Sequence, residues 1–186
     1  NQGIAQLFAK NMQSLNQGQT SWNGYEHNAL FQNLDHQSYK NIGYLMGVGC
    51  EFDARAVIGN DLDGDGRPDL IISEYELVPA RGYIMKLHVY RNLLPTKNNW
   101  VGIRLPESGG HAGLFGTTAE LHTGDRKQVR QYTCGDSFLS QHDNVFHFGI
   151  GNAKEVDKVV IRWPNGTERT LAKPAINTYH AVTPAD

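Results

Sequence analysis

The stretch of sequence that decides the fold is Asp61-Leu62-Asp63-Gly64-Asp65-Gly66-Arg67-Pro68-Asp69, which runs into the apolar residues Leu70-Ile71-Ile72. Aspartates stand at positions 1, 3, 5 and 9 of this stretch, and a glycine stands at position 6, where a tight cation-binding loop turns sharply. Calcium takes about six to eight oxygen ligands, which alternate residues of such a loop can supply. The pattern therefore predicts one Ca²⁺ held by Asp61, Asp63, Asp65, the main-chain carbonyl of Arg67, and Asp69.

The chain that leaves this loop is predicted to be a strand rather than a helix. An EF-hand loop requires a glutamate at position 12, where this sequence has Ile72. Four carboxylates within nine residues repel one another unless a cation neutralises them, so an acidic turn without a metal is the less favoured alternative. We therefore expect a calcium loop between β-strands, with a structural role.

The composition excludes several classes of partner. The 186 residues carry 17 Lys and Arg against 19 Asp and Glu, a net charge of −2, without a basic run that would follow a nucleic acid backbone. No apolar stretch approaches the ~18 residues that a membrane span needs. Glycine accounts for 20 residues and charged residues for 19%, which favours turns and strands over long charged helices. We expect a mostly β protein that binds no nucleic acid and contains no membrane span.

One helix and many short strands are expected along the chain. Apolar residues recur at helical spacing in residues 4–15, on a face formed by Ile4, Leu7, Phe8, Met12 and Leu15. Beyond residue 113, β-type runs recur about every 10–12 residues, which is typical of a β-sandwich or a small barrel. Pro164-Asn165-Gly166 predicts a hairpin turn between two of these runs. The polar, glycine-rich residues 106–113 mark a candidate boundary region.

The cation loop resembles the calcium loop of FG-GAP/VCBS repeats, which form the blades of integrin-like β-propellers. The upstream residues that match are Ser21-Trp22-Asn23-Gly24-Tyr25-Glu26-His27-Asn28-Ala29-Leu30-Phe31-Gln32-Asn33-Leu34, Gly47 and Arg55-Ala56-Val57. They resemble the last blades of the cartilage acidic protein 1-like family. This resemblance implies a propeller-blade-like β-hairpin unit with one calcium loop over residues 21–95, after an N-terminal helix and linker over residues 1–20.

The second half of the chain resembles the ASPIC/UnbV domain, which follows such repeats in that family. The matching motifs are Gly116-Thr117-Thr118-Ala119-Glu120-Leu121, Gln128-Val129-Arg130, Ser137-Phe138-Leu139-Ser140-Gln141, His147-Phe148-Gly149-Ile150-Gly151, Val156-Asp157 and Arg162-Trp163-Pro164-Asn165-Gly166. Together the two resemblances cover about residues 20–183. They imply that residues 96–186 form a C-terminal β-sandwich-like domain.

Two further sites concern covalent chemistry. Cys50 and Cys134 lack the spacing of a zinc site, which leaves a disulfide or two buried thiols. We predict the disulfide, which would tie the two halves together and stabilise the fold by roughly 4–5 kcal/mol in the chain-entropy model. Asn165-Gly166-Thr167 fits the N-glycosylation sequon, although the same residues also suit a hairpin turn.

Other clusters carry weaker signals. Gly135-Asp136-Ser137-Phe138, with His142 and His147 nearby, resembles the serine centre of a hydrolase, but the flanking residues favour a polar turn without catalysis. The spacing of the eight histidines does not indicate a transition-metal site, and Gly149-Ile150-Gly151 indicates a tight turn rather than a nucleotide loop. We expect the tryptophans to lie in the core or at an interface, and the alternative is that they stack on a glycan; they are Trp22, Trp100 and Trp163.

These features predict a non-catalytic extracellular β module, stabilised by calcium and used for adhesion or assembly. Open strand edges and the apolar face of residues 4–15 need a cover, so the expected partner is another protein or further copies of this chain, a surface filament included. A secreted or cell-surface location fits, because extracellular calcium fills even a modest site. The alternatives are an accessory protein or enzyme of a biosynthetic pathway, or a glycan-binding module.

Overall fold

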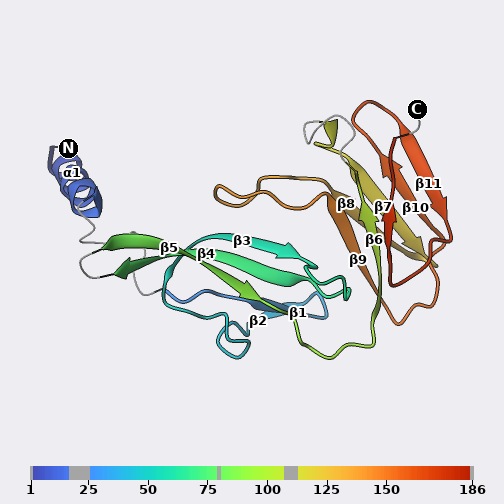
Figure 1. Cartoon of the computed structure of the whole chain (residues 1–186), viewed down its shortest axis with the longest axis horizontal. Helices are drawn as coiled ribbons and strands as arrows, with labels where there is room; N and C mark the ends of the chain where they lie inside the picture. The colour runs from blue at the N-terminus through green and yellow to red at the C-terminus, as the bar shows by residue number, and fades with distance from the viewer. Residues whose placement is uncertain (1, 17–25, 79–80, 107–112, 185–186) are drawn as a thin grey trace. The chain divides into compact units, whose positions relative to one another are not determined.

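The computed structural model describes residues 2–16, 26–78, 81–106 and 113–184, and it is mostly β with one N-terminal helix (Figure 1). The strands form sheets of two, four, three and three strands, and none of these described sheets closes into a barrel. The expected mostly β fold with one short helix is thereby confirmed. Within the described residues, no helix has both the length and the apolar character of a membrane span. The chain divides into two compact units, residues 1–57 with 70–90 and residues 58–69 with 91–186.

The first unit contains a helix, a hairpin and a three-stranded sheet. Helix α1 (Gln2–Asn16) includes the segment with helical periodicity, and its Ile4 and Leu7 side chains are exposed. β1 (Phe31–Leu34) and β2 (Ser38–Asn41) pair antiparallel. The sheet has the order β3-β4-β5 and is built from β3 (Asp53–Asn60), β4 (Asp69–Val78) and β5 (Gly82–Tyr90). Because β5 pairs with β4 and ends the sheet order, it is an edge strand.

A buried carboxylate lies inside the first unit. Glu74 on β4 is only 1% exposed. Its Oε1 accepts hydrogen bonds from Cys50 Sγ at 2.6 Å and Asn28 Nδ2 at 2.8 Å, and its Oε2 lies 3.0 Å from His88 Nε2. A buried carboxylate is costly unless such partners replace its water. The first unit is therefore organised around a polar network.

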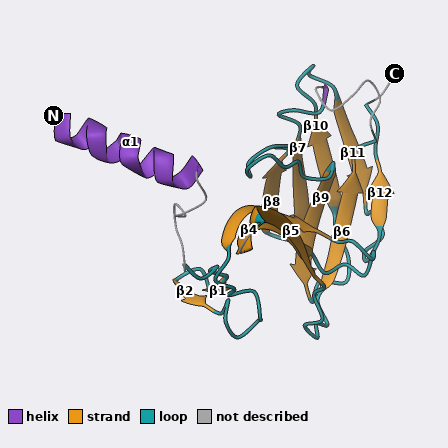
Figure 2. Ribbon diagram, turned by 60° about the vertical axis from the view of Figure 1, so that its left-hand side comes forward, coloured by secondary structure: helices purple, strands orange, loops and turns teal. Residues whose placement is uncertain are grey.

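The second unit is β-sandwich-like and has two sheets, which Figure 2 shows. The sheet with the order β11-β10-β7-β8 is built from β7 (Thr118–Thr123), β8 (Arg126–Gln131), β10 (Lys158–Arg162) and β11 (Glu168–Ala172). The sheet with the order β12-β6-β9 is built from β6 (Asn99–Arg104), β9 (Val145–Gly151) and β12 (Tyr179–Ala181). β12 runs parallel to β6, and the other strand pairs of this unit are antiparallel.

Alternate side chains of both sheets meet in one apolar core. In β9, Phe146, Phe148 and Ile150 are buried in this core, whereas His147 is not part of it. The buried side chains that β6, β7 and β10 contribute are Val101, Ile103, Ala119, Leu121, Val159 and Ile161. Since successive side chains of a strand point to opposite faces, Trp100 and His147 lie on the outer face of the sheet β12-β6-β9.

The 61–69 loop belongs to the second unit. It was expected within a unit over residues 21–95, but its contacts group residues 58–69 with residues 91–186. The loop lies against the outer face of the sheet β12-β6-β9, where Gly66 approaches the indole of Trp100 so closely that an added Cβ would fall 1.8 Å from its Nε1. The candidate cation site is thus part of the same compact unit as the sandwich.

Candidate metal centre

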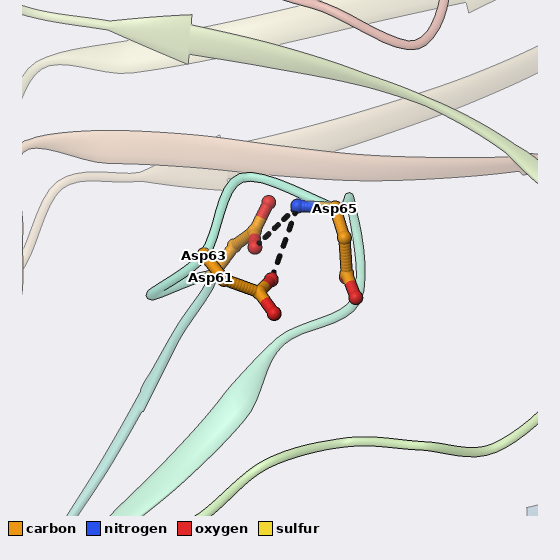
Figure 3. A group of neighbouring side chains, drawn as sticks. All are labelled: Asp61, Asp63 and Asp65. Atoms are coloured by element: carbon orange, nitrogen blue, oxygen red, sulfur yellow. Dashed lines mark hydrogen bonds between the residues drawn. The ribbon is translucent and has the colours of Figure 1, made fainter.

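Three of the predicted calcium ligands come together in the structure. Asp61, Asp63 and Asp65 each offer a carboxylate oxygen, and these oxygens lie within 4.8 Å of one another (Figure 3). The main-chain N–H of Asp65 donates to the carboxylates of Asp61 and Asp63, at 3.1 and 3.3 Å. Gly64 and Gly66 donate to Asp61 at 2.9 and 2.8 Å, with φ values of +77° and +83° that favour glycine. The loop is therefore wound around the carboxylate of Asp61.

Asp69 is not one of these grouped carboxylates. It is 3% exposed, and its two oxygens accept main-chain hydrogen bonds from Leu62 at 3.0 Å and Asn92 at 2.7 Å. These two bonds tie the start of the loop and the segment after β5 to the residue that ends the loop. Its predicted role as a direct ligand, like that of the Arg67 carbonyl, stays a prediction.

Two guanidinium groups already oppose the charge of the cluster. Arg67 pairs with Asp65, and its Nε donates to the carbonyl of Asn92 at 2.9 Å. Arg91 Nε lies 2.7 Å from Asp63 Oδ2. The repulsion among the carboxylates is thus reduced by arginines as well as by any cation, and these ion pairs favour the acidic-turn alternative more than the sequence pattern does. A cation at this site would compete with both arginines.

An aromatic layer on the sandwich supports the loop. The Tyr179 hydroxyl donates a hydrogen bond to Asp61 Oδ2 at 2.6 Å. The Trp100 ring centroid lies 4.6 Å from that of Tyr179 and 5.3 Å from that of His147. These side chains come from β12, β6 and β9, and Asp61 is 118 positions from Tyr179 in sequence. This layer was not predicted from the sequence, because no local pattern links residues so far apart.

Burial and the acidic loop change the ionisation of two members of this layer. Burial lowers the pKa of His147 below its ordinary value, although the charge of Asp61 acts in the opposite direction. Burial, the hydrogen bond to Asp61 and the charge of Asp61 raise the pKa of Tyr179 well above its ordinary value. At neutral pH the phenol is therefore a hydrogen-bond donor.

A pocket of about 260 Å³ opens beside Asp61. Its lining includes Asp136, His142, His147 and Tyr179, so the histidines that flank the serine-like motif do meet on one side of the second unit. His142 Nε2 is hydrogen-bonded to Asp136, and Ser137 is not among the described residues that line the pocket. The arrangement thus brings together histidines and carboxylates without the serine of the motif.

The predicted Cys50–Cys134 disulfide is not formed, because both cysteines are free thiols. Cys50 Sγ instead donates to the buried carboxylate of Glu74. Cys134, which is 7% exposed, packs in the apolar core of the sandwich. The two thiols were predicted to bond to each other, whereas each one has its contacts within its own unit.

The remaining residues predicted from the sequence are three tryptophans and Asn165. Trp100 and Trp163 are 8% and 4% exposed, so neither presents a free face for stacking on a glycan. Trp22 lies outside the described residues. Asn165 is exposed in the turn between β10 and β11, where its Oδ1 accepts a hydrogen bond from the main-chain N–H of Thr167 at 2.9 Å. The hairpin role of these residues is confirmed, and glycosylation of Asn165 stays a prediction.

The match to a known family falls within the second unit. Residues 108–186 match the family described as ASPIC and UnbV. Over 137 residues, or 71% of the chain, it is 31% identical to cartilage acidic protein 1 of Xenopus tropicalis. It is also 31% identical over 121 residues, or 63% of the chain, to cartilage acidic protein 1 of Mus musculus. The chain covers 20% and 18% of these two proteins, so it spans about a fifth of the curated relatives it matches. The resemblance to FG-GAP/VCBS repeats stays a prediction.

Proposed function

We propose that this chain is a non-catalytic, extracellular β module in which the 61–69 loop binds Ca²⁺ for a structural purpose, and which serves adhesion or assembly. The observation that carries the calcium assignment is the convergence of the Asp61, Asp63 and Asp65 oxygens within 4.8 Å. Similarity to proteins named for cartilage supports a secreted or cell-surface location. The proposed partner is a protein or another copy of this chain.

The donor set fits a hard divalent cation. Carboxylate oxygens are ligands that Ca²⁺ prefers, and no soft sulfur or imidazole ligand lies in the group of Asp61, Asp63 and Asp65. Asp61 is held in place by main-chain N–H groups of the loop and by Tyr179, which limits the freedom that binding must remove. When bound, the ion would add positive charge at the clustered carboxylates, in competition with Arg67 and Arg91. With the ion bound, the carboxylates of Asp61, Asp63 and Asp65 would be held together, which would fix the loop on the sandwich.

Calcium-dependent unfolding tests this function. A cation that binds only the folded chain stabilises it by about 2.7 kcal/mol when its free concentration is about 100 times its dissociation constant. We therefore expect Tm to rise on adding CaCl₂ and to fall in EGTA. Asp63→Asn removes one ligand and is expected to abolish most of that response. Asp125→Asn removes an exposed aspartate from the turn between β7 and β8 of the same unit and is expected to preserve it.

The outcome of this test is unambiguous in both directions. An identical Tm of the wild-type chain in CaCl₂ and EGTA, together with no heat of Ca²⁺ binding, would contradict the structural calcium site. An equal response in Asp63→Asn and wild type would move the site away from the loop. Mg²⁺ at the same concentration serves as the ionic-strength control, because it requires a smaller and more regular set of ligands.

An apolar strand in the first unit supports the assembly part of the proposal. On the edge strand β5, Met85, Leu87 and Val89 are 59%, 67% and 58% exposed. They recur at every second residue and so share one face of the strand. Exposed apolar groups beside an open strand edge are typical of surfaces that pair with another chain. Light scattering on the calcium-loaded chain would show concentration-dependent association, whereas a monomer at high micromolar concentration would contradict self-assembly.

A further inference from the structure

We propose that Tyr179 is a positioning residue for Asp61, so that the sandwich of the second unit sets the cation affinity of the 61–69 loop. The inference rests on the proposed calcium site and goes beyond it, because it assigns the affinity to a residue 118 positions away from the loop. The strand that carries Tyr179, β12, lies within the segment that matches the ASPIC and UnbV family. The 61–69 loop and the sandwich would then act together in binding the cation.

Asp61 is the residue through which this coupling would act. Its Oδ1 accepts from the main-chain N–H groups of Gly64 and Asp65, at 2.9 and 3.1 Å. Its Oδ2 accepts from Gly66 at 2.8 Å and from the Tyr179 hydroxyl at 2.6 Å. The first three donors move with the loop, whereas the fourth is fixed to a strand of the sandwich. Tyr179 therefore ties the orientation of the carboxylate to the frame of the sheet.

Tyr179 is itself held tightly. Its ring lies over Gly102 of β6, where an added Cβ would fall 2.0 Å from the ring. The guanidinium of Arg104 lies over the ring, 5.4 Å from its centroid, and the centroid of the Trp100 ring lies 4.6 Å from that of Tyr179. A ring that packs against Gly102, Arg104 and Trp100 has little freedom to follow the carboxylate if the loop shifts. The hydroxyl thus marks one position for Asp61 Oδ2 before any ion arrives.

Hydrogen bonds to metal-ligating carboxylates typically change metal affinity by about 10–100-fold when they are removed. Tyr179→Phe removes the hydroxyl and keeps the ring that packs on Trp100 and Gly102. We therefore expect its Ca²⁺ dissociation constant, measured by titration calorimetry on the whole chain, to rise by at least about tenfold. Its Tm in EGTA is expected to stay close to that of the wild type, since the ring contacts remain.

Tyr132→Phe is the matched control. The Tyr132 hydroxyl is also hydrogen-bonded within the second unit, but its partner is Asn144 Oδ1, at 3.3 Å, rather than Asp61. Its Ca²⁺ dissociation constant is expected to match that of the wild type. Removing a tyrosine hydroxyl elsewhere in the same unit therefore separates the effect of losing the bond to Asp61 from the effect of a general loosening of the sandwich.

Terbium gives a spectroscopic signature that a merely structural role would not move. Tb³⁺ binds the same hard oxygen ligands, and Trp100 next to Gly66 is placed to sensitise its emission. The emission is expected in wild type and in Trp163→Phe, to be lost in Trp100→Phe, and to require at least about tenfold more Tb³⁺ in Tyr179→Phe.

The possible results separate the two proposals. If the wild type binds neither Ca²⁺ nor Tb³⁺, the proposed calcium site fails. If the wild type binds both and Tyr179→Phe binds them equally well, the site stands and the positioning role of Tyr179 is overturned. Failure of Tyr179→Phe to fold in EGTA would also overturn it, because the residue would then be structural.

Discussion

In the second compact unit, the space between the two sheets is filled by apolar side chains such as Phe148, Val159 and Ile161, each fully buried. In the first unit, the least exposed of the described side chains is the carboxylate of Glu74. Val48 and Ile72 are the buried apolar residues among the described part of that unit. The same chain thus uses two ways to hold strands together, an apolar core and a hydrogen-bonded carboxylate.

The two interiors respond differently to a lost atom. An apolar core loses free energy in proportion to the area and volume removed, and its neighbours relax partly into the space. A buried carboxylate depends on each donor, because an oxygen left without a partner keeps its full desolvation cost. The first unit also leaves Met85, Leu87 and Val89 of β5 exposed, whereas the second unit has an apolar core between its two sheets. We expect the second unit to be the more stable of the two.

The largest effect is expected from the apolar core. Phe148→Ala removes a ring that is 0% exposed, and such truncations cost about 3–5 kcal/mol. Urea unfolding, followed by the fluorescence of Trp100 and Trp163, would measure the loss in this unit. Phe138→Ala, at a side chain that is 56% exposed, is the matched control and should change stability by less than about 0.5 kcal/mol. Equal losses in both variants would contradict the assignment of the core.

A smaller loss is expected from the polar network of the first unit. Cys50→Ala removes one of the donors to Glu74 Oε1 and leaves the buried carboxylate underbonded, at a cost of about 1–3 kcal/mol. Cys50→Ser keeps a donor at this position and is expected to lose less. Hydrogen exchange of peptides from β4 and β5, read by mass spectrometry, would report the change locally. Equal protection in Cys50→Ala and wild type would show that the thiol does not support Glu74.

The local parts of this molecule were within reach of the sequence. The spacing of Asp61, Asp63 and Asp65 predicts that their carboxylates converge, because alternate residues of a tight loop face the same point. The helical periodicity of residues 4–15 and the turn at Pro164-Asn165-Gly166 are equally local signals, and both elements are present. These features depend on residues only a few positions apart.

The long-range parts were out of reach for the same physical reason. Nothing in the pattern of residues 61–69 indicates that Tyr179 donates to Asp61, or that Trp100 lies against Gly66. The structure has no Cys50–Cys134 disulfide, and pairing two cysteines by elimination ignores the other groups a thiol can meet, here Glu74. The loop was also expected in the first half of the chain, since sequence order suggested a boundary that spatial contacts do not follow.

A pH titration separates the two units by the sign of their response. Burial lowers the pKa of His147 below 6.5. The charge of Arg130 lowers this pKa further and the charge of Asp61 raises it, but burial is the largest cause. The folded second unit therefore favours the neutral ring. As the pH falls below about 6.5, the unfolded chain gains the proton first and this unit loses stability. Burial, with the hydrogen bond and charge of Glu74, raises the pKa of Cys50 above 9.0, so the first unit loses stability as the pH rises past that value.

Hydrogen exchange and tryptophan fluorescence in EGTA, compared at pH 5, 7 and 9.5, would read the two units separately. His147→Gln is expected to flatten the acid response of the second unit, and Cys50→Ala the alkaline response of the first. We expect these pH-dependent changes in stability to be smaller than the loss that Cys50→Ala causes at neutral pH, because His147 and Cys50 are both partly exposed. An acid response of the second unit that persists in His147→Gln would assign it to another group.

The smallest effect on stability, and the sharpest contrast between the units, is expected at their edge strands. β5 has the sequence GYIMKLHVY and exposes Met85, Leu87 and Val89, whereas the edge strand β8 has the sequence RKQVRQ and surrounds its exposed Val129 with charge. Charged residues on an edge oppose pairing with another chain, and apolar ones favour it. Leu87→Thr keeps a strand-forming residue and should change the folding free energy by less than about 0.5 kcal/mol, yet reduce concentration-dependent light scattering. Val129→Thr should leave scattering unchanged, and equal scattering by Leu87→Thr and wild type would show that the β5 face is not where the chains meet.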